Sequence, residues 1–411
     1  MVRDTGDMHW GLSDNQECWM NEKPIRKEFL PFSRPTIGQA EIDEVVDSLR
    51  SGWLTTGPKV AKLEEEFSRW SGGQAAIAVN SATSGLHLAL KTLDLEPDDE
   101  VITTPITWPS TVNNIEICGA RPVFADVDRH TLQIDPYEIE KRISPRTRAI
   151  IPVHFAGAPC DLDPIRELCK EHDLALIEDA AHALGTWYKG RLIGADSQMA
   201  VFSFHPIKNI TTGEGGMILC NDERRAARIR RLRFHGISRD AWKRYAKGGS
   251  PQYEVIEPGF KYNMLDLQAA IGLHQFSKLD EFNKRRQELA QNYDRLIKDI
   301  QEIVPLGVVS WPHQHAWHLY VVRLKIEAIK ISRDQFLSEL QEQNIGTGLH
   351  FPAMHLQRYY REKYGYGPGL LPHAEWNSIR LFSLPLYPLL KEDDQEDVIQ
   401  ALKVIIARYK R

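Results

Sequence analysis

Three segments of the chain place charged or small polar side chains directly after short apolar runs. The run Leu174–Ile177 leads through Glu178 to Asp179, and the run Ala200–Phe204 is followed by Lys208. An apolar setting removes water from a lysine, which lowers its pKa and makes its amine a nucleophile. An aspartate at a strand end could hold a proton on a heterocyclic nitrogen. Because most lysines are solvated and many such aspartates form turns, neither residue defines a site alone.

The third segment, Val79–Gly85, joins an apolar run to a helical stretch through small residues. Small side chains let the backbone approach a ligand, and the free N–H groups at the start of a helix suit a phosphate. An ordinary helix cap formed by Ser81 or Thr83 is the alternative interpretation. Together, a phosphate cradle, an acid at position 179 and a lysine 29 residues later are the groups that pyridoxal phosphate requires.

The elements that must position these groups alternate between short apolar runs and amphipathic stretches. The runs are Ala75–Val79, Val101–Thr104, Pro122–Phe124, Ala149–Val153, Leu174–Ile177, Ala200–Phe204 and Gly216–Cys220. The helical stretches between them are Ser84–Leu93, Asp135–Ile143 and Asp161–His172. This alternation predicts an α/β fold with a largely parallel sheet that helices cover on both faces. Such a sheet binds ligands beyond the carboxyl ends of its strands.

The length of 411 residues indicates more than one structural part. We expect residues 1–24 to be a poorly ordered extension, residues 25–300 a large domain and residues 301–411 a smaller α+β domain. The large domain should contain a helix over Gly38–Leu49 and a long helical region over Leu265–Leu296. The elements expected in the smaller domain are a strand at Trp317–Leu324, a helix at Arg333–Gln343, a strand at Ile379–Leu384 and a helix at Glu392–Tyr409.

The composition argues against several classes of protein. Lysine and arginine number 51 and aspartate and glutamate 56, so the net charge of −5 argues against a nucleic-acid-binding protein. The sequence lacks both the long apolar run of a membrane span and the apolar core of a secretory signal. Five scattered cysteines without a C-x-x-C pair indicate reduced thiols, and together these features favour the cytoplasm.

The chain resembles the DegT/DnrJ/EryC1/StrS family of sugar-nucleotide aminotransferases, a fold-type-I branch of the pyridoxal phosphate enzymes. The resemblance covers about residues 28–408, and its most specific segments are AVNSATSGLHLAL, EDAAHALG, FSFHPIKNITTGEGG and GFKYNMLDLQAAIG. It implies a large domain with a mainly parallel sheet, a smaller C-terminal α+β domain, and pyridoxal 5′-phosphate as the cofactor.

The resemblance also implies roles for individual residues. Lys208 would bind the cofactor's aldehyde and later shuttle a proton, and Asp179 would pair with the pyridine nitrogen. The other implied cofactor contacts are Ala82, Thr83 and Ser203 at the phosphate, Trp108 on the ring face and His182 near the ring's O3′.

Two further residues extend this expected site. Asn263 matches a position from which relatives reach the cofactor phosphate of the neighbouring subunit, so the resemblance implies a homodimer with shared active sites. Here the motif reads Lys-Tyr-Asn, where other members carry Asn-Tyr-Arg. His350, in the segment TGLHF, would reach the sugar.

Two polar clusters keep alternative interpretations. The three histidines of the segment HQHAWH favour a loop edge over a metal site, and we expect no metal. Arg358, Arg361 and Lys363 could contact a nucleotide or simply be surface charges.

The implied reaction moves an amino group from L-glutamate, which leaves as 2-oxoglutarate, to the C4 carbonyl of a nucleotide-linked ketosugar. A UDP-4-keto-pentose is favoured, and a UDP- or dTDP-linked 4-keto-6-deoxy sugar is the alternative. Products of this class feed lipopolysaccharide, surface glycans or glycosylated metabolites. A related 3-dehydratase would carry histidine in place of Lys208, and a non-catalytic regulator should lack Lys208 or Asp179. Both residues are present, which favours the aminotransferase.

Overall fold

The computed structural model describes residues 23–238 and 252–411. Nearly all of the expected N-terminal extension therefore lies outside the described residues. Within them, no helix is both long and apolar enough to cross a membrane. Cys118, Cys160, Cys169 and Cys220 are free thiols.

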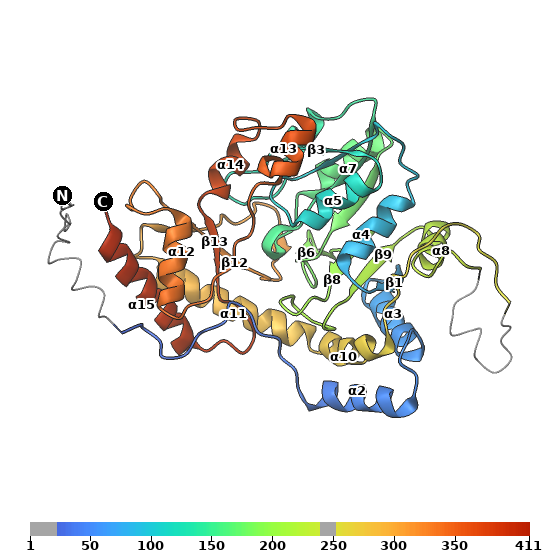
Figure 1. Ribbon diagram of the computed structural model, residues 1–411, viewed down its shortest axis with the longest axis horizontal. Helices are drawn as coiled ribbons and strands as arrows, with labels where there is room; N and C mark the ends of the chain where they lie inside the picture. Colours follow the sequence, from blue (N-terminus) through green and yellow to red (C-terminus); the bar gives the residue numbers. More distant parts are fainter. Residues whose placement is uncertain (1–22, 239–251) are drawn as a thin grey trace, which may run out of the picture.

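A seven-stranded sheet forms the centre of the larger part of the structure (Figure 1). Its strands, in spatial order, are β1 (Ala75–Val79), β9 (Gly216–Cys220), β8 (Met199–Ser203), β5 (Ala175–Asp179), β4 (Thr147–Ile151), β2 (Glu100–Thr103) and β3 (Arg121–Phe124). Only β9 runs against its neighbours, since it is antiparallel to both β1 and β8 while the other pairs are parallel. The predicted mainly parallel sheet is confirmed.

Alternate residues of the central strands enter two separate apolar cores. Ala76 and Ala78 of β1 pack with the helices on one face, whereas Ile77 and Val79 pack with those on the other. The first face is covered by α3 (Pro58–Trp70), α6 (Pro136–Glu140), α7 (Leu162–Glu171) and α10 (Asp266–Ser277). The second face is covered by α4 (Ala82–Lys91), α5 (Pro109–Ile117) and α8 (Glu223–Leu232). The strands are nearly continuous apolar runs because both of their faces are buried.

The beginnings of the helices follow from their first residues. Ser81 caps α4, because its Oγ accepts a hydrogen bond from the backbone N–H of Ser84 at 3.1 Å. Helix α3 has Pro58 at its first position, and a carboxylate from elsewhere in the chain caps it. Asp266 accepts from the backbone N–H groups of Gly57 and Val60 at 2.8 and 3.0 Å. This contact joins the start of α3 to the start of α10.

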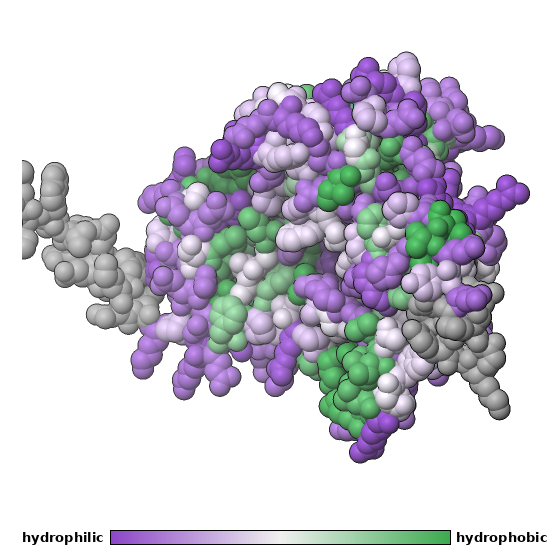
Figure 2. Space-filling model, turned by 45° about the vertical axis from the view of Figure 1, so that its right-hand side comes forward, coloured by the Kyte–Doolittle hydropathy of each residue, from purple (hydrophilic) through white to green (hydrophobic). Residues whose placement is uncertain are grey.

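Helix α2 (Gln39–Ser51) buries polar residues and exposes apolar ones, which is the reverse of an ordinary surface helix. It packs along α10, yet its buried residues are Glu41 and Ser48. The apolar side chains of Ile42 and Leu49 are 49% and 55% exposed. Figure 2 shows hydrophobic residues gathered on the protruding lower end of the molecule, where α2 lies in Figure 1.

The C-terminal part is built on a second, antiparallel sheet of β10 (Ile303–Pro305), β12 (Tyr320–Leu324) and β13 (Leu381–Leu384). An apolar core joins one face of this sheet to α11 (Leu279–Ile297), α12 (Arg333–Glu342) and α15 (Glu392–Tyr409). The short helices are α13 (Arg358–Tyr364) and α14 (Pro372–Ser378), with 3-10 turns at Phe155–Gly157 and Met354–Leu356. A small sheet pairs β6 (Trp187–Tyr188) with β7 (Arg191–Leu192) and with β11 (His313–Gln314).

The predicted helical region Leu265–Leu296 is two helices, α10 and α11, that meet at Lys278. The second half of α11 belongs to the same apolar core as the C-terminal sheet, and so does Leu30. Residues on both sides of the predicted boundary at 300 therefore share one core, and that boundary stays a prediction.

Gly216 is a close-packed point where β9 passes the start of α4. A Cβ atom there would lie 2.8 Å from the backbone nitrogen of Ala82 and 2.8 Å from the carbonyl oxygen of Phe202. Because both atoms belong to the backbone, we expect Gly216→Ala to lower the free energy of unfolding by about 2 kcal/mol. Chemical denaturation measures the change. Gly367→Ala is the control, since a Cβ there meets nothing within 4 Å, and equal effects of the two substitutions would contradict this packing.

Candidate active site

The three polar segments meet at one edge of the central sheet. Strands β1, β5 and β8 run in the same direction, so their carboxyl ends lie together. The ends of the three strands lie at nearly the same level in the sheet, because Val79 and Ser203 both pair with Gly216, and Val201 pairs with Asp179. The start of α4, the end of β8 and Asp179 therefore surround one region.

Lys208 lies five residues beyond the end of β8, in the loop between β8 and β9. Its Nζ is 3.3 Å from Nε2 of His318. The side chain is half-buried, and loss of hydration at the amine lowers its pKa to about 7, although the negative charge of Asp179 opposes this shift. Near neutral pH a large fraction of the Lys208 amine is therefore uncharged, which is the form that attacks a carbonyl carbon.

Asp179 is buried and its carboxylate is held by two donors. Its Oδ2 accepts from the hydroxyl of Thr111 at 2.7 Å, and its Oδ1 accepts from the backbone N–H of Ala181 at 3.2 Å. Burial raises the pKa of Asp179, whereas the Thr111 hydroxyl, the Ala181 N–H and the positive charge of Lys208 lower it. A cation facing this carboxylate would keep it ionised.

Thr111 is a functional residue that the sequence prediction missed, and it lies on α5, a helix that was also not predicted. Its hydroxyl is 2.9 Å from that of Thr107. The available signal was Pro109, because proline favours the first position of a helix, followed by Val112 and Ile115 on one face.

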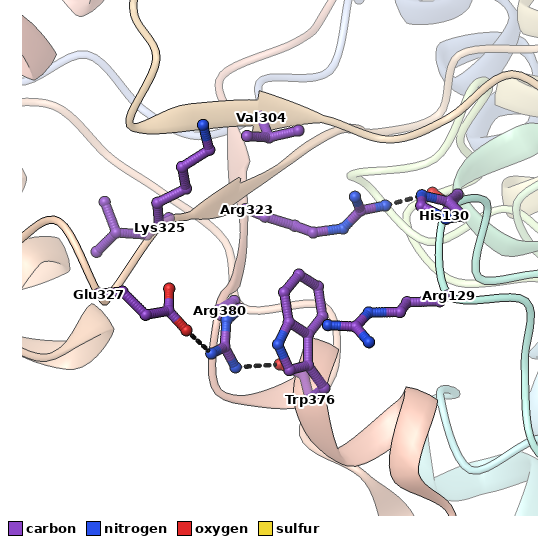
Figure 3. Close-up of a pocket in the computed structure, with 9 residues that line it drawn as sticks. Arg129, His130, Val304, Arg323, Lys325, Glu327, Trp376 and Arg380 are labelled. Carbon is purple, nitrogen blue, oxygen red and sulfur yellow. Dashed lines mark hydrogen bonds and ion pairs between the residues drawn. The ribbon is translucent and has the colours of Figure 1, made fainter.

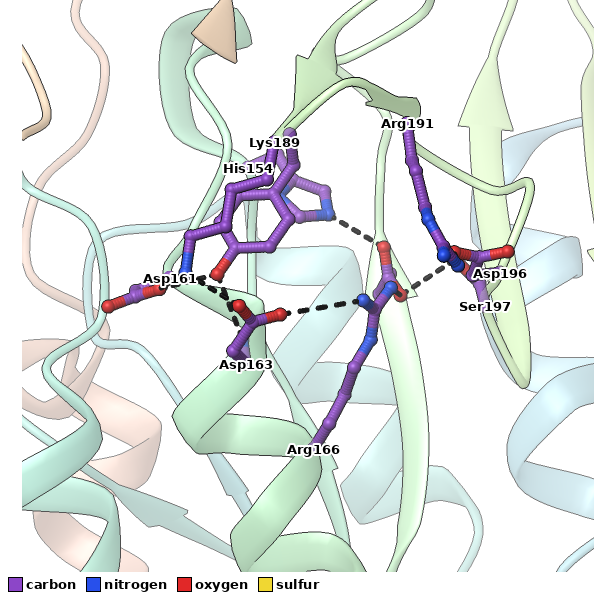
Figure 4. Close-up of polar contacts among 10 residues, drawn as sticks. His154, Asp161, Asp163, Arg166, Lys189, Arg191, Asp196 and Ser197 are labelled. Atoms are coloured by element: carbon purple, nitrogen blue, oxygen red, sulfur yellow. Dashed lines mark hydrogen bonds and ion pairs between the residues drawn. The ribbon is translucent and has the colours of Figure 1, made fainter. Parts of the chain in front are cut away.

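Glu178 points to the opposite side of β5 from Asp179, as successive residues of a strand do. It is completely buried, and it contacts Nε2 of His154 at 3.1 Å and the hydroxyl of Ser197 at 2.7 Å. Arg166 lies 3.9 Å away. Figure 4 shows these three partners. Of the two adjacent carboxylates, therefore, only Asp179 faces Lys208.

Three buried histidines surround the Lys208 amine. His182 and His318 have ring centroids 4.3 Å apart, and His182 also stacks on Phe351. Nδ1 of His350 lies 2.8 Å from the hydroxyl of Ser383. Burial and the nearby charge of Lys208 lower the pKa of His350 to about 3, and the same two causes hold the pKa values of His182 and His318 well below the ordinary range. All three rings are therefore neutral at physiological pH.

The start of α4 has the expected features of a phosphate cradle. Ala82 is buried and Thr83 is exposed, while the carbonyl oxygen of Thr83 accepts from the side-chain amide of Asn114 at 2.9 Å. The first N–H groups of a helix lack intrahelical acceptors. Ser203 is buried at the end of β8. Ser81 is indeed a helix cap, and this role leaves the N–H groups of Ala82 and Thr83 available to an anion.

Two residues of the predicted cofactor site, Trp108 and Asn263, contact other groups of this chain. Trp108 is 60% exposed, and its ring lies 6.0 Å from that of Phe351. Asn263 pairs with Val79 at the edge of β1, and its side-chain amide donates to the hydroxyl of Thr56 at 2.6 Å. Asn263 is thus anchored beside the phosphate cradle of its own chain.

The histidines of HQHAWH go to three different places. His313 contacts the carbonyl oxygen of Trp311, His315 stacks on Trp317, and only His318 reaches Lys208. Among residues 23–238 and 252–411, no group of three or more histidine, cysteine or acidic residues could hold a metal ion.

Two of the basic residues near Tyr359 form ion pairs. Arg358 pairs with Glu362 within α13 at 2.8 Å, and Lys363 pairs with Glu116 of α5. These contacts favour the surface-charge interpretation for both.

The residues at this sheet edge fit pyridoxal phosphate. Nδ1 of His318 is buried without a hydrogen-bond partner, and the Asp179 carboxylate faces a half-buried amine. The amine of Lys208 suits the cofactor's aldehyde, and the buried carboxylate of Asp179 suits its ring nitrogen. The unpaired N–H groups at the start of α4 suit its phosphate.

Comparison with known proteins identifies the family. Residues 35–403 match the DegT/DnrJ/EryC1/StrS aminotransferase family. The chain belongs to this family. A relative, the uncharacterised protein MJ1066 of Methanocaldococcus jannaschii, is 49% identical over 383 residues, which are 93% of this chain and 99% of the relative.

Two solved aminotransferases share the fold over nearly the whole chain. Spr1654 of Streptococcus pneumoniae, assigned as a sugar aminotransferase and solved in its PMP form, is 32% identical with a TM-score of 0.86, covering 92% of this chain and 99% of its own. PseC of Helicobacter pylori, an aminotransferase involved in the biosynthesis of pseudoaminic acid, is 29% identical with a TM-score of 0.86, covering 93% and 100%.

The pKa of Lys208 predicts its reactivity in cofactor-free protein. An amine is acylated only when neutral, so acetylation of Lys208 by acetic anhydride should rise as the pH increases through about 7. Ordinary lysines should need a pH of about 10.4. Asp179→Asn removes a charge that raises the lysine's pKa, so it should shift the Lys208 midpoint to lower pH. Peptide mass spectrometry measures both midpoints, and an unshifted, lysine-like midpoint in the wild-type protein would refute the prediction.

Proposed function

We propose that this chain is a pyridoxal 5′-phosphate-dependent aminotransferase that moves an amino group from L-glutamate to the C4 carbonyl of a nucleotide-linked ketosugar. The observation that carries the proposal is the amine of Lys208, with a pKa near 7, in the same buried region as the Asp179 carboxylate. Membership of an aminotransferase family supports the reaction class. Spr1654 has been solved in both a PLP form and a PMP form, which supports the cofactor.

Each residue then has a distinct task. When bound, pyridoxal phosphate supplies a carbonyl that carries the amino group and a ring that delocalises the negative charge left by proton removal. Asp179, ionised and held by Thr111, keeps a proton on the ring nitrogen. Lys208 Nζ would hold the cofactor's aldehyde, and its amine would accept and donate the proton that the transfer requires. Its pKa near 7 suits both accepting and donating that proton.

The phosphate is held at the carboxyl ends of β1 and β8. The backbone N–H groups of Ala82 and Thr83 and the hydroxyl of Ser203 are the donors. His182 and His318 are neutral, so the low pKa of Lys208 comes from burial of its amine and not from charged histidines. His182 would lie against the cofactor near its O3′.

The sugar binds on the open side of the site, where the rings of His350 and Trp108 both lie near that of Phe351. The ring of Trp108 is exposed, so it can stack on the cofactor or face the substrate once both are bound. The role of PseC in pseudoaminic acid biosynthesis supports a sugar-derived substrate. We favour a UDP-4-keto-pentose as the acceptor, and products of this type serve lipopolysaccharide or other surface glycans.

Activity on a substrate panel tests this function. With glutamate as donor, we expect the purified protein to aminate at least one sugar in a panel of UDP-, dTDP- and GDP-4-ketosugars, and to form 2-oxoglutarate. Lys208→Ala should abolish turnover on every sugar, because no other group can hold the aldehyde. Lys189→Ala is the control, since this lysine lies on the β6–β7 turn and pairs with Asp163 at 2.6 Å. Turnover by Lys208→Ala above background would remove the mechanism.

We further propose that the functional unit is a homodimer with active sites shared between the two chains. The inverted helix α2 supports this, because Ile42 and Leu49 expose apolar surface while Glu41 and Ser48 are buried. A helix of this kind gains stability when its apolar face packs on a second copy. The exposed ring of Trp108 also fits a site that a partner completes, whereas Asn263 lies beside the phosphate cradle of its own chain.

The dimer prediction is tested by placing a charge on the apolar face of α2. Leu49→Glu should shift the protein from dimer to monomer in sedimentation experiments, since a buried unpaired carboxylate costs several kcal/mol. Aminotransferase activity should fall in parallel. Lys62→Glu introduces the same side chain, with a net charge change twice as large, at an exposed position on α3 and should leave the dimer intact. A Leu49→Glu protein that stays dimeric would rule out this surface as the interface.

A further inference from the structure

A cavity of about 450 Å³ lies between the C-terminal sheet and the loop that follows β3. Arg129 and His130 line it from that loop, and Arg323, Lys325 and Arg380 line it from the C-terminal part. Figure 3 shows Arg129 and Arg380 reaching toward Trp376 from these different parts of the chain. The volume is typical of a small-molecule site.

Positive charge is concentrated in this cavity although the whole chain carries a net charge of −5. Four of the lining side chains are cationic, and Glu327 is the acidic one among them. Glu327 pairs with Arg380, and Asp128, which does not line the cavity, adds a second negative charge near Arg323. Two positive charges are therefore left uncompensated among these groups.

The two arginines from the C-terminal sheet are buried and incompletely bonded. Arg323 is 5% exposed and Arg380 is 6% exposed. The guanidinium of Arg323 donates to the carbonyl oxygen of His130, and that of Arg380 donates to the carbonyl oxygen of Trp376 at 2.8 Å. The Nε atom of each arginine is buried without a hydrogen-bond partner. A buried charged group with an unused donor is costly unless a ligand or ion satisfies it.

The surroundings of Arg323 lower its pKa. Burial lowers the pKa of Arg323 to about 10, and the charge of Arg129 contributes to the same shift. An anion bound between the guanidinium groups of Arg129 and Arg323 would raise the pKa of Arg323 again, because it would offset both the burial and the charge repulsion. Trp376 cannot offer a free face to a planar ligand, because Arg129 and Arg380 lie 4.0 and 4.2 Å from its ring centroid. The chemistry therefore favours a compact anion rather than a stacked aromatic group.

This cavity is separate from the Lys208 site. Arg323 lies five residues beyond His318, which corresponds to roughly 16 Å along an extended strand. Leu319 and Val321 precede Arg323 on the same face of the strand, and both are buried in an apolar core with Leu381. That packing closes the direct path between the two sites.

We propose that the cavity lined by Arg129, Arg323, Lys325 and Arg380 is a second anion site that binds the phosphate group of free phosphate or of a small phosphate ester. Paired arginines bind phosphate with several parallel N–H donors, and Lys325 adds a point charge. Arg129 lies on the loop after β3, whereas Arg323, Lys325 and Arg380 come after β10 in the sequence. A bound phosphate would therefore link these two parts of the chain. The site does not depend on the proposed reaction.

Calorimetric titration of the cofactor-loaded protein with inorganic phosphate tests the site. We expect one phosphate per chain beyond the cofactor. Arg129→Gln and Lys325→Gln should each weaken binding by about fivefold, the size of one exposed charge pair. Both positions are exposed, so neither change should prevent folding. Glu327→Gln removes the carboxylate that competes for Arg380, so it should tighten binding by a similar factor.

Lys403→Gln is the matched control, because it removes one exposed positive charge from α15, away from the cavity. Its affinity should equal that of the wild-type protein. Equal phosphate affinity in wild-type, Arg129→Gln and Lys325→Gln proteins would overturn the proposal, as would the absence of binding heat together with no phosphate-dependent change in Tm. A parallel titration with glycerol 3-phosphate distinguishes the two sources, since tighter binding of the ester identifies an organic phosphate and tighter binding of phosphate identifies the free ion.

Discussion

The structure depends on holding an amine and a carboxylate of opposite charge in one poorly hydrated region. Lys208 and Asp179 influence each other's pKa, and burial pushes each toward its neutral form. Left alone, such a pair is only marginally stable as ions. Thr111 and the N–H of Ala181 stabilise the carboxylate, but burial outweighs them and raises the pKa of Asp179. Burial also leaves Lys208 partly neutral near pH 7, and a cation bound against Asp179, such as a protonated ring nitrogen, would keep that carboxylate ionised, which is the division of roles that amine transfer needs.

Much of the large part of the fold follows from the sequence. The runs Ala75–Val79 and Gly216–Cys220 are strands with the predicted bounds, because each is apolar on both faces and is bounded by small or polar residues. Asp179, Ser203 and Lys208 lie near one another for a reason that the sequence also contains, since parallel strands end at the same edge. The directions of individual strands, including the reversed β9, were not predicted from the pattern.

What the sequence left open depends on contacts between distant segments. The stripe of Ile42 and Leu49 predicts a helix, but periodicity alone does not tell whether that stripe meets this chain's core or another surface. His318 and Thr111 lie 110 and 68 residues from the groups that they contact, so no local motif marks them. The second anion cavity combines residues 129 and 380. These residues come together only because α14 and β12 pack against the loop after β3.

The hairpin that contains Lys208 has a consequence for how quickly this amine can meet an aldehyde. The loop leaves β8 and returns as the adjacent β9, and Phe204 exchanges backbone hydrogen bonds with Gly215 and Thr212 at its base. Both ends of the loop are therefore tethered to neighbouring strands, which keeps Lys208 close to the end of β8. The effective concentration of the amine stays high after it has been displaced, so the enzyme can recapture its cofactor before that molecule diffuses away.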